Sequence, residues 1–299
     1  MIDTHVALNQ GGSVTDHLTV RQKTNLDGFP KAGEMIELTG AHELEASDRA
    51  IVNLLYQHAH DSGRLADPTA EWHVPLTRLR VSLHESNDRL VESLTRILRV
   101  TVRVPILEPE TGEPAWLLTH LIEGFKLPVK AAGGGVVRFH IPRDLQPILA
   151  RSNRWGRIKA RVVCAMTSKY AVALYELVQL RANMHRSVET FPIVRFRDLL
   201  GVPPGAYERG ANFDARVIQP ALLEVNGLSD TEVNLTLVRR SRFAPIEAVT
   251  VAWRPKRGEA YRAVLKERRG SKLGRMARLR GKGETMQPIS LALPSLPDR

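Results

Sequence analysis

The stretch from Phe191 to Trp253 decides the fold of this chain: FPIVRFRDLLGVPPGAYERGANFDARVIQPALLEVNGLSDTEVNLTLVRRSRFAPIEAVTVAW. After a short apolar run, a compact helical segment extends from Arg195 to Leu200. The segment from Gly201 to Gly205 predicts a sharp turn, because proline cannot continue a helix and glycine tolerates positive φ. A second helical pattern, Asn212 to Asn226, and two strand-like runs follow. Helix, turn, helix and hairpin in this order predict a winged helix-turn-helix.

The second helical pattern has two different faces when its residues are placed about 100° apart. Its apolar residues cover one half of the helix, and Asn212, Arg216 and Gln219 lie together on the other half. Arginine can bind guanine through two hydrogen bonds, and asparagine or glutamine can bind adenine in the same way. This face is therefore a candidate for reading DNA bases. The alternative is that these three side chains are ordinary solvated surface residues. Pro220 removes one backbone donor, so a bend is expected there.

Composition limits the possible classes of protein. A chain of 299 residues, 43% of them hydrophobic, can form two domains with a core each. No apolar run approaches the ~20 residues that cross a bilayer, and the N-terminus lacks a signal pattern, so a membrane protein is not expected. The single cysteine, Cys164, excludes an internal disulfide and favours a reducing compartment such as the cytoplasm.

The charge of the chain predicts a polyanionic partner. The net charge is +11, and the residues from Lys256 onward contain twelve Lys and Arg against four Asp and Glu. Nucleic acid is the leading candidate partner, and an anionic membrane surface and structured RNA are alternatives. The basic C-terminal residues predict a largely disordered tail that is weakly attracted to DNA. The alternative is a tail that becomes helical on DNA.

The first half of the chain repeats the same order of elements. A helix is expected behind Ser47, a short helix from Leu76 to Val81 and a longer helix from Glu85 to Arg99. Alternation of apolar and polar residues then predicts strands, beginning at Val100. In the longer helix, an arginine-rich face that includes Arg89 and Arg96 lies opposite the apolar stripe, where it could contact the DNA backbone.

The expected fold class is α+β, with two tandem winged-helix domains. In the second half, Thr167 or Ser168 caps a helix that is apolar almost all the way round and should therefore be buried on most sides. We expect a flexible arm at 1–40, a first winged helix at 41–145, a linker at 146–157, a second winged helix at 158–256, and a basic, largely disordered tail at 257–299.

Three segments resemble the plasmid replication initiators that bind iterons, the short direct repeats of an origin. They read SKYAVALYELVQLR, FRDLLGVPPGAYERGANFDARVIQPALLEVN and LSDTEVNLTLV. The resemblance is strong from about Thr167 to Val238 and weaker from Glu45 to Pro142, and it covers neither tail. The chain departs from the family pattern at Val225, where isoleucine is commoner. From Gly205 to Ala211 it is glycine-rich where relatives have several lysines, which puts phosphate contacts by that segment in doubt.

The resemblance implies a DNA-binding replication initiator without enzymatic activity or cofactor. The second winged helix would bind the major groove of an iteron, and the first would contact the neighbouring DNA and form a homodimer. Such proteins initiate replication as monomers and repress their own promoter as dimers. The side chains that would face bases are Tyr207, Arg209, Asn212 and Arg216, joined by Gln219 from the helical pattern. Phosphate contacts are expected from Thr167, Ser168 and Lys169 at a helix N-terminus and from Arg239, Arg240 and Arg242 at the wing tip.

Other functions have weaker support in the sequence. A winged-helix transcriptional regulator without a role in replication would share most of these features. His58 and His60 resemble the His-x-His metal pair of rolling-circle nickases, but residues two apart point in different directions on a helix, so no metal site is expected. The host initiator and the replicative helicase are possible further partners. Gln287 to Leu293 loosely resembles the peptides that bind the sliding clamp, which makes the clamp another candidate.

Overall fold

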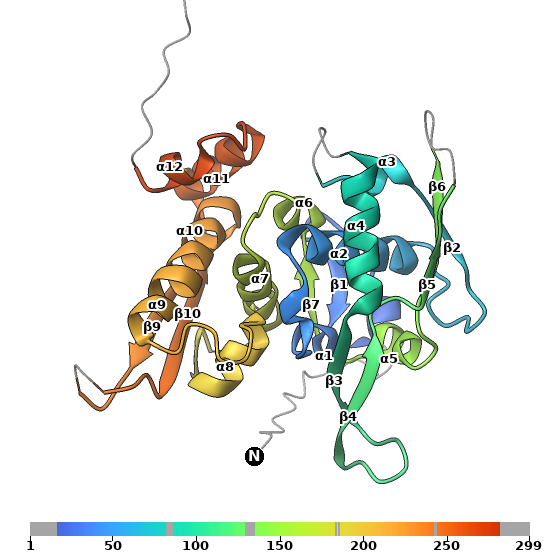
Figure 1. Ribbon diagram of the computed structural model, residues 1–299, viewed down its shortest axis with the longest axis horizontal. Coiled ribbons are helices and arrows are strands. Elements are labelled where there is room, and N and C mark those ends of the chain that lie inside the picture. The colour runs from blue at the N-terminus through green and yellow to red at the C-terminus, as the bar shows by residue number, and fades with distance from the viewer. Residues whose placement is uncertain are drawn as a thin grey trace, which may run out of the picture.

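The computed structural model describes residues 17–81, 86–128, 135–182, 184, 186–241 and 244–281. It contains two winged-helix halves side by side, with helix α7 (Lys169–Arg181) between them (Figure 1). The predicted α+β architecture with two tandem winged helices is confirmed.

The first half follows the predicted order, with a short strand added between its first two helices. Its elements are α2 (Ala46–Asp61), β2 (Trp72–Pro75), α3 (Leu76–Leu79), α4 (Asn87–Arg99), β3 (Thr101–Leu107), β4 (Pro114–His120), β5 (Gly124–Lys126) and β6 (Val136–His140). Strands β3 and β4 form an antiparallel hairpin, and β2, β6 and β5 form a separate antiparallel sheet in that order. The sequence predicts a buried stripe of Leu90, Val91, Leu94, Ile97 and Leu98 on α4. The structure buries Leu90, Leu94 and Ile97 and half-buries Leu98, but Val91 is 43% exposed, so its assignment to the stripe is wrong.

The second half has the same order of elements. They are α7, β8 (Val188–Pro192), α8 (Ile193–Leu200), α9 (Gly210–Phe213), η4 (Asp214–Ile218), α10 (Gln219–Leu228), β9 (Thr231–Val238) and β10 (Ala248–Pro255). Strand β10 pairs with both β8 and β9, so the hairpin β9–β10 is the wing and β8 extends its sheet. The architectural repeat predicted from the sequence is therefore present. Helix α7 is buried along its whole length, because α2 and β7 cover one side of it and α8 and α10 the other.

The N-terminal segment differs from the expected flexible arm. Residues 17–40 are folded and contain η2 (Thr19–Arg21), β1 (Phe29–Ala32) and α1 (Gly33–Ile36), and η3 (Ala41–Glu43) follows. All four residues of β1 are buried, and β1 pairs antiparallel with β7 (Trp155–Ile158), Phe29 opposite Ile158. The prediction of a flexible arm is wrong for this part, because a strand of four residues is stabilised by a partner far away in the sequence. Residues 1–16 lie outside the described part.

The expected linker at 146–157 is also wrong, because this segment is regular structure. It contains most of α5 (Leu145–Arg151) and of β7, and α6 (Ala160–Val163) follows. Gly156 explains how β7 fits against α7. A Cβ atom at this position would lie 2.7 Å from the backbone nitrogen of Leu180, so only glycine allows the strand to approach the helix this closely. The two halves are therefore joined by packed structure.

The C-terminal segment is folded as far as residue 281. It forms α11 (Gly258–Arg269) and α12 (Arg275–Leu279), which pack against the end of α10 (Figure 1). The prediction of a largely disordered tail is wrong for 258–281. Residues 282–299, which include the possible clamp-binding segment Gln287–Leu293, lie outside the described residues.

Charged side chains hold the two halves together. Lys31 on β1 forms an ion pair with Glu176 on α7 at 2.8 Å, and both side chains are buried. Glu37, behind α1, pairs with Arg181 on α7 at 2.7 Å. Burial opposes the ionisation of Glu37, but Arg154 and Arg181 outweigh it and hold the pKa of this carboxyl group below its usual range. The interface therefore depends on matched charges, and loss of one partner would leave a buried charge unpaired.

Candidate nucleic-acid interface

The candidate reading helix runs without interruption through α9, η4 and α10, from Gly210 to Leu228. The middle part, Asp214–Ile218, is a π-helical turn, which is wider than an α-helical turn. Pro220 stands two residues after this turn; it has no N–H to donate, and its ring crowds the carbonyl four residues earlier. The wider turn accommodates the proline. The bend expected at Pro220 stays a prediction; what the structure shows is the π turn just before it.

The two faces of this helix match the prediction. Phe213, Val217 and Ile218 are buried in the second half. Asn212 and Arg216 are exposed, and neither side chain has a hydrogen bond or an ion pair within the described residues. Gln219 is also exposed, but its Nε2 donates to Asp214 Oδ1 at 3.0 Å. Arg209 precedes the helix as its N-cap residue and is exposed.

The turn before the helix is held from inside by Arg197 on α8. Its guanidinium group donates to the carbonyl oxygens of Ala206 and Tyr207 and lies 5.0 Å from the ring centre of Phe213. Tyr207 has a φ of 54°, an uncommon value for a residue other than glycine. Its side chain is half-buried and hydrogen-bonds to Tyr170, and burial together with this neighbour raises the pKa of Tyr170 to about 12. Tyr207 thus faces the protein core, unlike the base contact expected for it.

The wing tip contains two of the three predicted arginines. Arg239 donates to the carbonyl of Ala244 at 2.7 Å, and its guanidinium group lies where a Cβ of Gly210 would be. Arg239 therefore connects the wing to the first residue of the reading helix. Arg240 is exposed and pairs with Glu247 at 2.6 Å. Arg242 lies outside the described residues.

The N-terminus of α7 is occupied by a carboxylate of the protein itself. Glu224, fully buried on α10, accepts hydrogen bonds from the amides of Thr167 and Ser168, both at 2.9 Å, and from the hydroxyl of Thr167. The Ser168 hydroxyl caps the helix by accepting from the amide of Ala171. The amides expected to bind a DNA phosphate are thus already satisfied by Glu224. Glu224 could have been recognised in the sequence as an acid on the apolar face of its helix, where it must find donors.

Lys169 faces the first half of the chain. Its ammonium group donates to the carbonyl of His42 and lies 5.4 Å from the ring centre of Tyr170. Burial and the nearby Arg49 lower the pKa of Lys169. Lys169 is therefore a contact between the two halves, unlike the phosphate contact expected for it.

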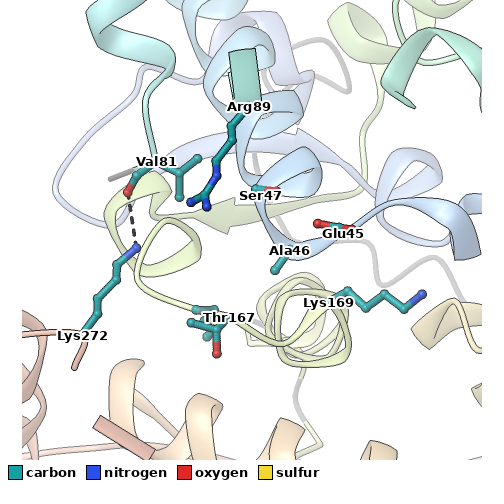
Figure 2. Close-up of a pocket in the computed structure, with 9 residues that line it drawn as sticks. Glu45, Ala46, Ser47, Val81, Arg89, Thr167, Lys169 and Lys272 are labelled. Carbon is teal, nitrogen blue, oxygen red and sulfur yellow. Dashed lines mark hydrogen bonds between the residues drawn. The ribbon is translucent and has the colours of Figure 1, made fainter. Parts of the chain in front are cut away.

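The two predicted arginines of α4 have different surroundings. Arg96 binds the buried carboxylate of Asp48 through two hydrogen bonds, 2.9 and 3.0 Å long, which makes it a structural residue. Arg89 is exposed, and its side chain has no partner within the described residues. It points into a cleft between the two halves, towards the start of α2 at Ser47 (Figure 2). Lys272 from the C-terminal segment closes one side of this cleft by donating to the carbonyls of Val81, at 3.4 Å, and Cys164, at 2.9 Å.

The described residues contain no group of three or more His, Cys, Asp or Glu side chains that could hold a metal ion. The ring of His60 contacts the carbonyl of Thr19 at 3.1 Å, and His58 packs near Phe139. Within the same ranges, none of the helices has the length and apolar character that crossing a membrane would need.

One solved structure similar to this chain is the crystal structure of the Pi initiator protein in complex with iteron DNA. The match has a TM-score of 0.51 and 12% sequence identity, and it covers 77% of this chain and 97% of that chain. At this identity the likeness concerns the fold. No curated protein matches the sequence.

Two family models match the sequence itself. Residues 31–179 match the first winged helix of the initiator replication proteins, and residues 192–252 match the second winged helix of the initiator Rep proteins. The two matches follow each other in the order of the two halves described above and together cover most of the chain. The chain therefore belongs to the family of initiator Rep proteins, the plasmid replication initiators built from two winged helices.

Proposed function

We propose that this initiator binds iterons at a plasmid origin and reads them with the exposed face of α9 and η4. The observation that carries the proposal is the pair Asn212 and Arg216, one turn apart on the reading helix. Both are exposed, and neither side chain has a partner among the residues that the structure describes. Unpaired side chains of these types can each form two hydrogen bonds to a base. Arg209, at the start of the helix, and Gln219, once it releases Asp214, would extend the same face.

The proposed contacts to the DNA backbone are fewer than the sequence implies. Arg89 remains a candidate because it is exposed and unpaired. Arg239 lies against Gly210 at the start of the reading helix, and in the described part of the chain Arg240 pairs only with the exposed Glu247, so both stay proposed contacts; Arg242 follows them in the sequence. We do not include Thr167, Ser168, Lys169 and Arg96. The first two and Arg96 are bound by the fully buried carboxylates of Glu224 and Asp48, and Lys169 donates to the His42 carbonyl of the other half.

The proposal is tested by measuring the affinity of Arg216→Ala for an iteron duplex and for a random duplex at one salt concentration. Loss of a two-bond contact to a base should cost ~1–3 kcal/mol on the iteron and little on random DNA. Arg186→Ala is a matched control, because Arg186 is an exposed arginine of the same half outside the reading helix. An equal loss on both duplexes would mean that Arg216 contacts phosphate, and no loss on either would overturn the proposal.

We also propose that the first half forms a homodimer that represses the initiator's own promoter, while the monomer acts at the origin. The hairpin β3–β4 supports this surface, because Trp116 and Leu118 on β4 are 52% and 63% exposed. Within the described residues β4 pairs only with β3, so its outer edge can pair with the same edge of a second copy across a twofold axis. Trp116→Glu should shift the protein to monomers in sedimentation and leave iteron affinity unchanged; a dimer of unchanged stability would refute this surface.

Origin activity separates this function from that of a winged-helix regulator. A plasmid whose only origin is this gene with its flanking repeats should replicate in transformed cells, and Arg216→Ala should abolish replication. The host initiator, the helicase and the sliding clamp are candidate partners, the clamp through Gln287–Leu293. Clamp capture that survives deletion of residues 286–299 would exclude that segment.

A further inference from the structure

The C-terminal helices form one body with the reading helix. Val264 of α11 is buried, and Leu279 of α12 lies against Gly227 of α10, where the position of a Cβ would be only 2.4 Å from the leucine Cδ2. The ammonium group of Lys256, just before α11, donates to the carbonyls of Asn226 and Ser229 at the end of α10, the latter at 3.0 Å. Helix α11 is therefore held at the C-terminal end of the reading helix (Figure 1).

A second set of contacts joins α11 to α12 through the carboxylate of Glu267. Arg275 is buried and donates to the carbonyls of Ala165 and Gly270, both at 3.0 Å. It also pairs with Glu267 at 3.2 Å, and Arg278 pairs with the same carboxylate at 2.7 Å. Glu267 is thus neutralised between α11 and α12, and its charge is not available to the outer face of α11.

The outer face of α11 has three unpaired cations. Arg262, Lys266 and Arg269 stand at positions i, i+4 and i+7, so they form one row along the helix. All three are exposed, and none has a hydrogen bond or an ion pair within the described residues. Like charges one turn apart destabilise an isolated helix. In the neighbouring wing, by contrast, Arg254 pairs with Glu232 at 2.9 Å.

The position of this row fits the edge of the groove that the reading helix would occupy. Leu228 follows Asn212 by sixteen residues, so α10 ends roughly 24 Å beyond the first base-reading residue at 1.5 Å per residue. The major groove of B-DNA is only about 12 Å wide, so a reading helix that crosses the groove would carry its C-terminal end past the phosphates that border it.

We propose that the row of Arg262, Lys266 and Arg269 on α11 binds the phosphate backbone of the DNA beside the groove read by α9 and η4. The row is roughly 10 Å long, and the long side chains of its three cations can each reach one phosphate of a strand, so we expect three phosphate contacts. This inference rests on the proposed function. It adds a DNA contact outside both winged helices and beyond residue 252, where the family match ends.

The test compares the salt dependence of DNA binding in the full chain and in the variant R262A/K266A/R269A. Each phosphate contact contributes about 0.9 to the slope of log affinity against log salt, so the slope should fall by about 2.7. Between 50 and 200 mM salt, the wild type should then lose about 40-fold more affinity than the variant. The effect should be the same on an iteron duplex and on a random duplex, since phosphates are common to both.

Two control variants make the result specific. R262K/K266R/R269K keeps the charges and should keep the slope. R138A/R143A/R151A removes three exposed, unpaired cations from the first half and should also leave the slope unchanged. Far-UV circular dichroism checks that α11 is still folded.

An unchanged slope in R262A/K266A/R269A would overturn the inference even if Arg216→Ala still loses iteron specificity. Binding to phosphatidylglycerol vesicles that depends on these three residues, without a change in slope, would reassign the row to a membrane surface.

Discussion

Glu224 on the reading helix accepts a hydrogen bond from the backbone amide of Thr167, the residue before the N-cap of α7, at 2.9 Å. The carboxylate is fully buried, and it also accepts from the amide of Ser168 at 2.9 Å. A buried carboxylate at a helix N-terminus satisfies amides that have no partner within the helix and interacts favourably with the helix dipole. This contact connects the position of the reading helix to α7, the helix that also packs against the first half.

Glu224→Ala should therefore destabilise the protein. The substitution leaves two backbone amides and one hydroxyl without their acceptor. Unsatisfied buried groups cost about 1–3 kcal/mol each, and water recovers part of this here because Thr167 is exposed. We expect urea unfolding to show a loss of about 2–4 kcal/mol. Glu232→Ala is the control, because Glu232 forms an exposed pair with Arg254 and should contribute at most about 1 kcal/mol. A loss no larger than that of the control would contradict a structural role for Glu224.

Alanine substitutions of Arg96 and Arg89 should have opposite effects on protein stability and on the salt dependence of DNA binding. Arg96→Ala leaves the fully buried Asp48 without its two-bond partner, so it should lower the unfolding free energy by about 1–3 kcal/mol. It should not change the salt dependence of DNA binding. Arg89→Ala removes an exposed, unpaired cation, so it should leave stability unchanged and lower the salt slope by about 0.9 if Arg89 binds one phosphate. Urea unfolding and binding titrations at several salt concentrations measure both effects, and a stable Arg96→Ala variant with a lowered slope would reverse the two assignments.

Local patterns predicted the parts of the fold that depend on local periodicity. The apolar stripe of α10, the all-round apolar character of α7 and the alternation in β3 each appear in the sequence within a single element. These features were sufficient to predict two winged helices and the exposed face of Asn212 and Arg216, because a helix places residues i and i+4 on one side whatever surrounds it.

Contacts between distant segments could not be predicted in this way. Strand β1 is stabilised by β7, far along the chain, and nothing in its four residues names that partner. The packing of the C-terminal helices α11 and α12 could not be predicted from local patterns either. Helix α11 buries only Val264 fully and is held largely by polar contacts such as Arg275 with Glu267, which leave no periodic apolar signal. For Tyr207 the family resemblance, and for Lys169 its place at a helix N-terminus, suggested DNA contact. In the structure Tyr207 contacts Tyr170 on α7 and Lys169 donates to the carbonyl of His42 in η3, contacts that no local pattern predicts.

Lys256, which binds the end of α10 just before α11, should make the stability of the protein depend on pH. Burial lowers its pKa from the ordinary 10.5 to about 8, and Glu232 and Asp230 offset this only in part. The unfolded chain then binds the proton more tightly than the folded protein does. The contribution of Lys256 to the unfolding free energy should therefore be greatest above pH 10.5 and should be lost as the pH falls through about 8. The difference in stability between wild type and Lys256→Met should change across this range, whereas Lys266→Met, at an exposed position, should follow the wild type. If the unfolding free energies of Lys256→Met and wild type changed in parallel with pH, the lowered pKa of Lys256 would be contradicted.

Gly227→Ala should weaken the packing of α11 and α12 against α10. In the helix interior, alanine is favoured over glycine by about 1 kcal/mol, so α10 itself should become no less stable. The added methyl group would, however, lie 2.4 Å from Leu279 Cδ2 and 2.8 Å from its Cδ1, so the Leu279 side chain must leave its contact with α10, and the attachment of α12 weakens. Hydrogen exchange should therefore show faster exchange in α11 and α12 with unchanged protection of α10, and trypsin should cleave earlier after Arg268 and Arg269. Gly124→Ala is the control, because a Cβ there meets no other atom within 4 Å. Unchanged exchange in α11 and α12 would mean that the contact between Leu279 and Gly227 does not hold these helices in place.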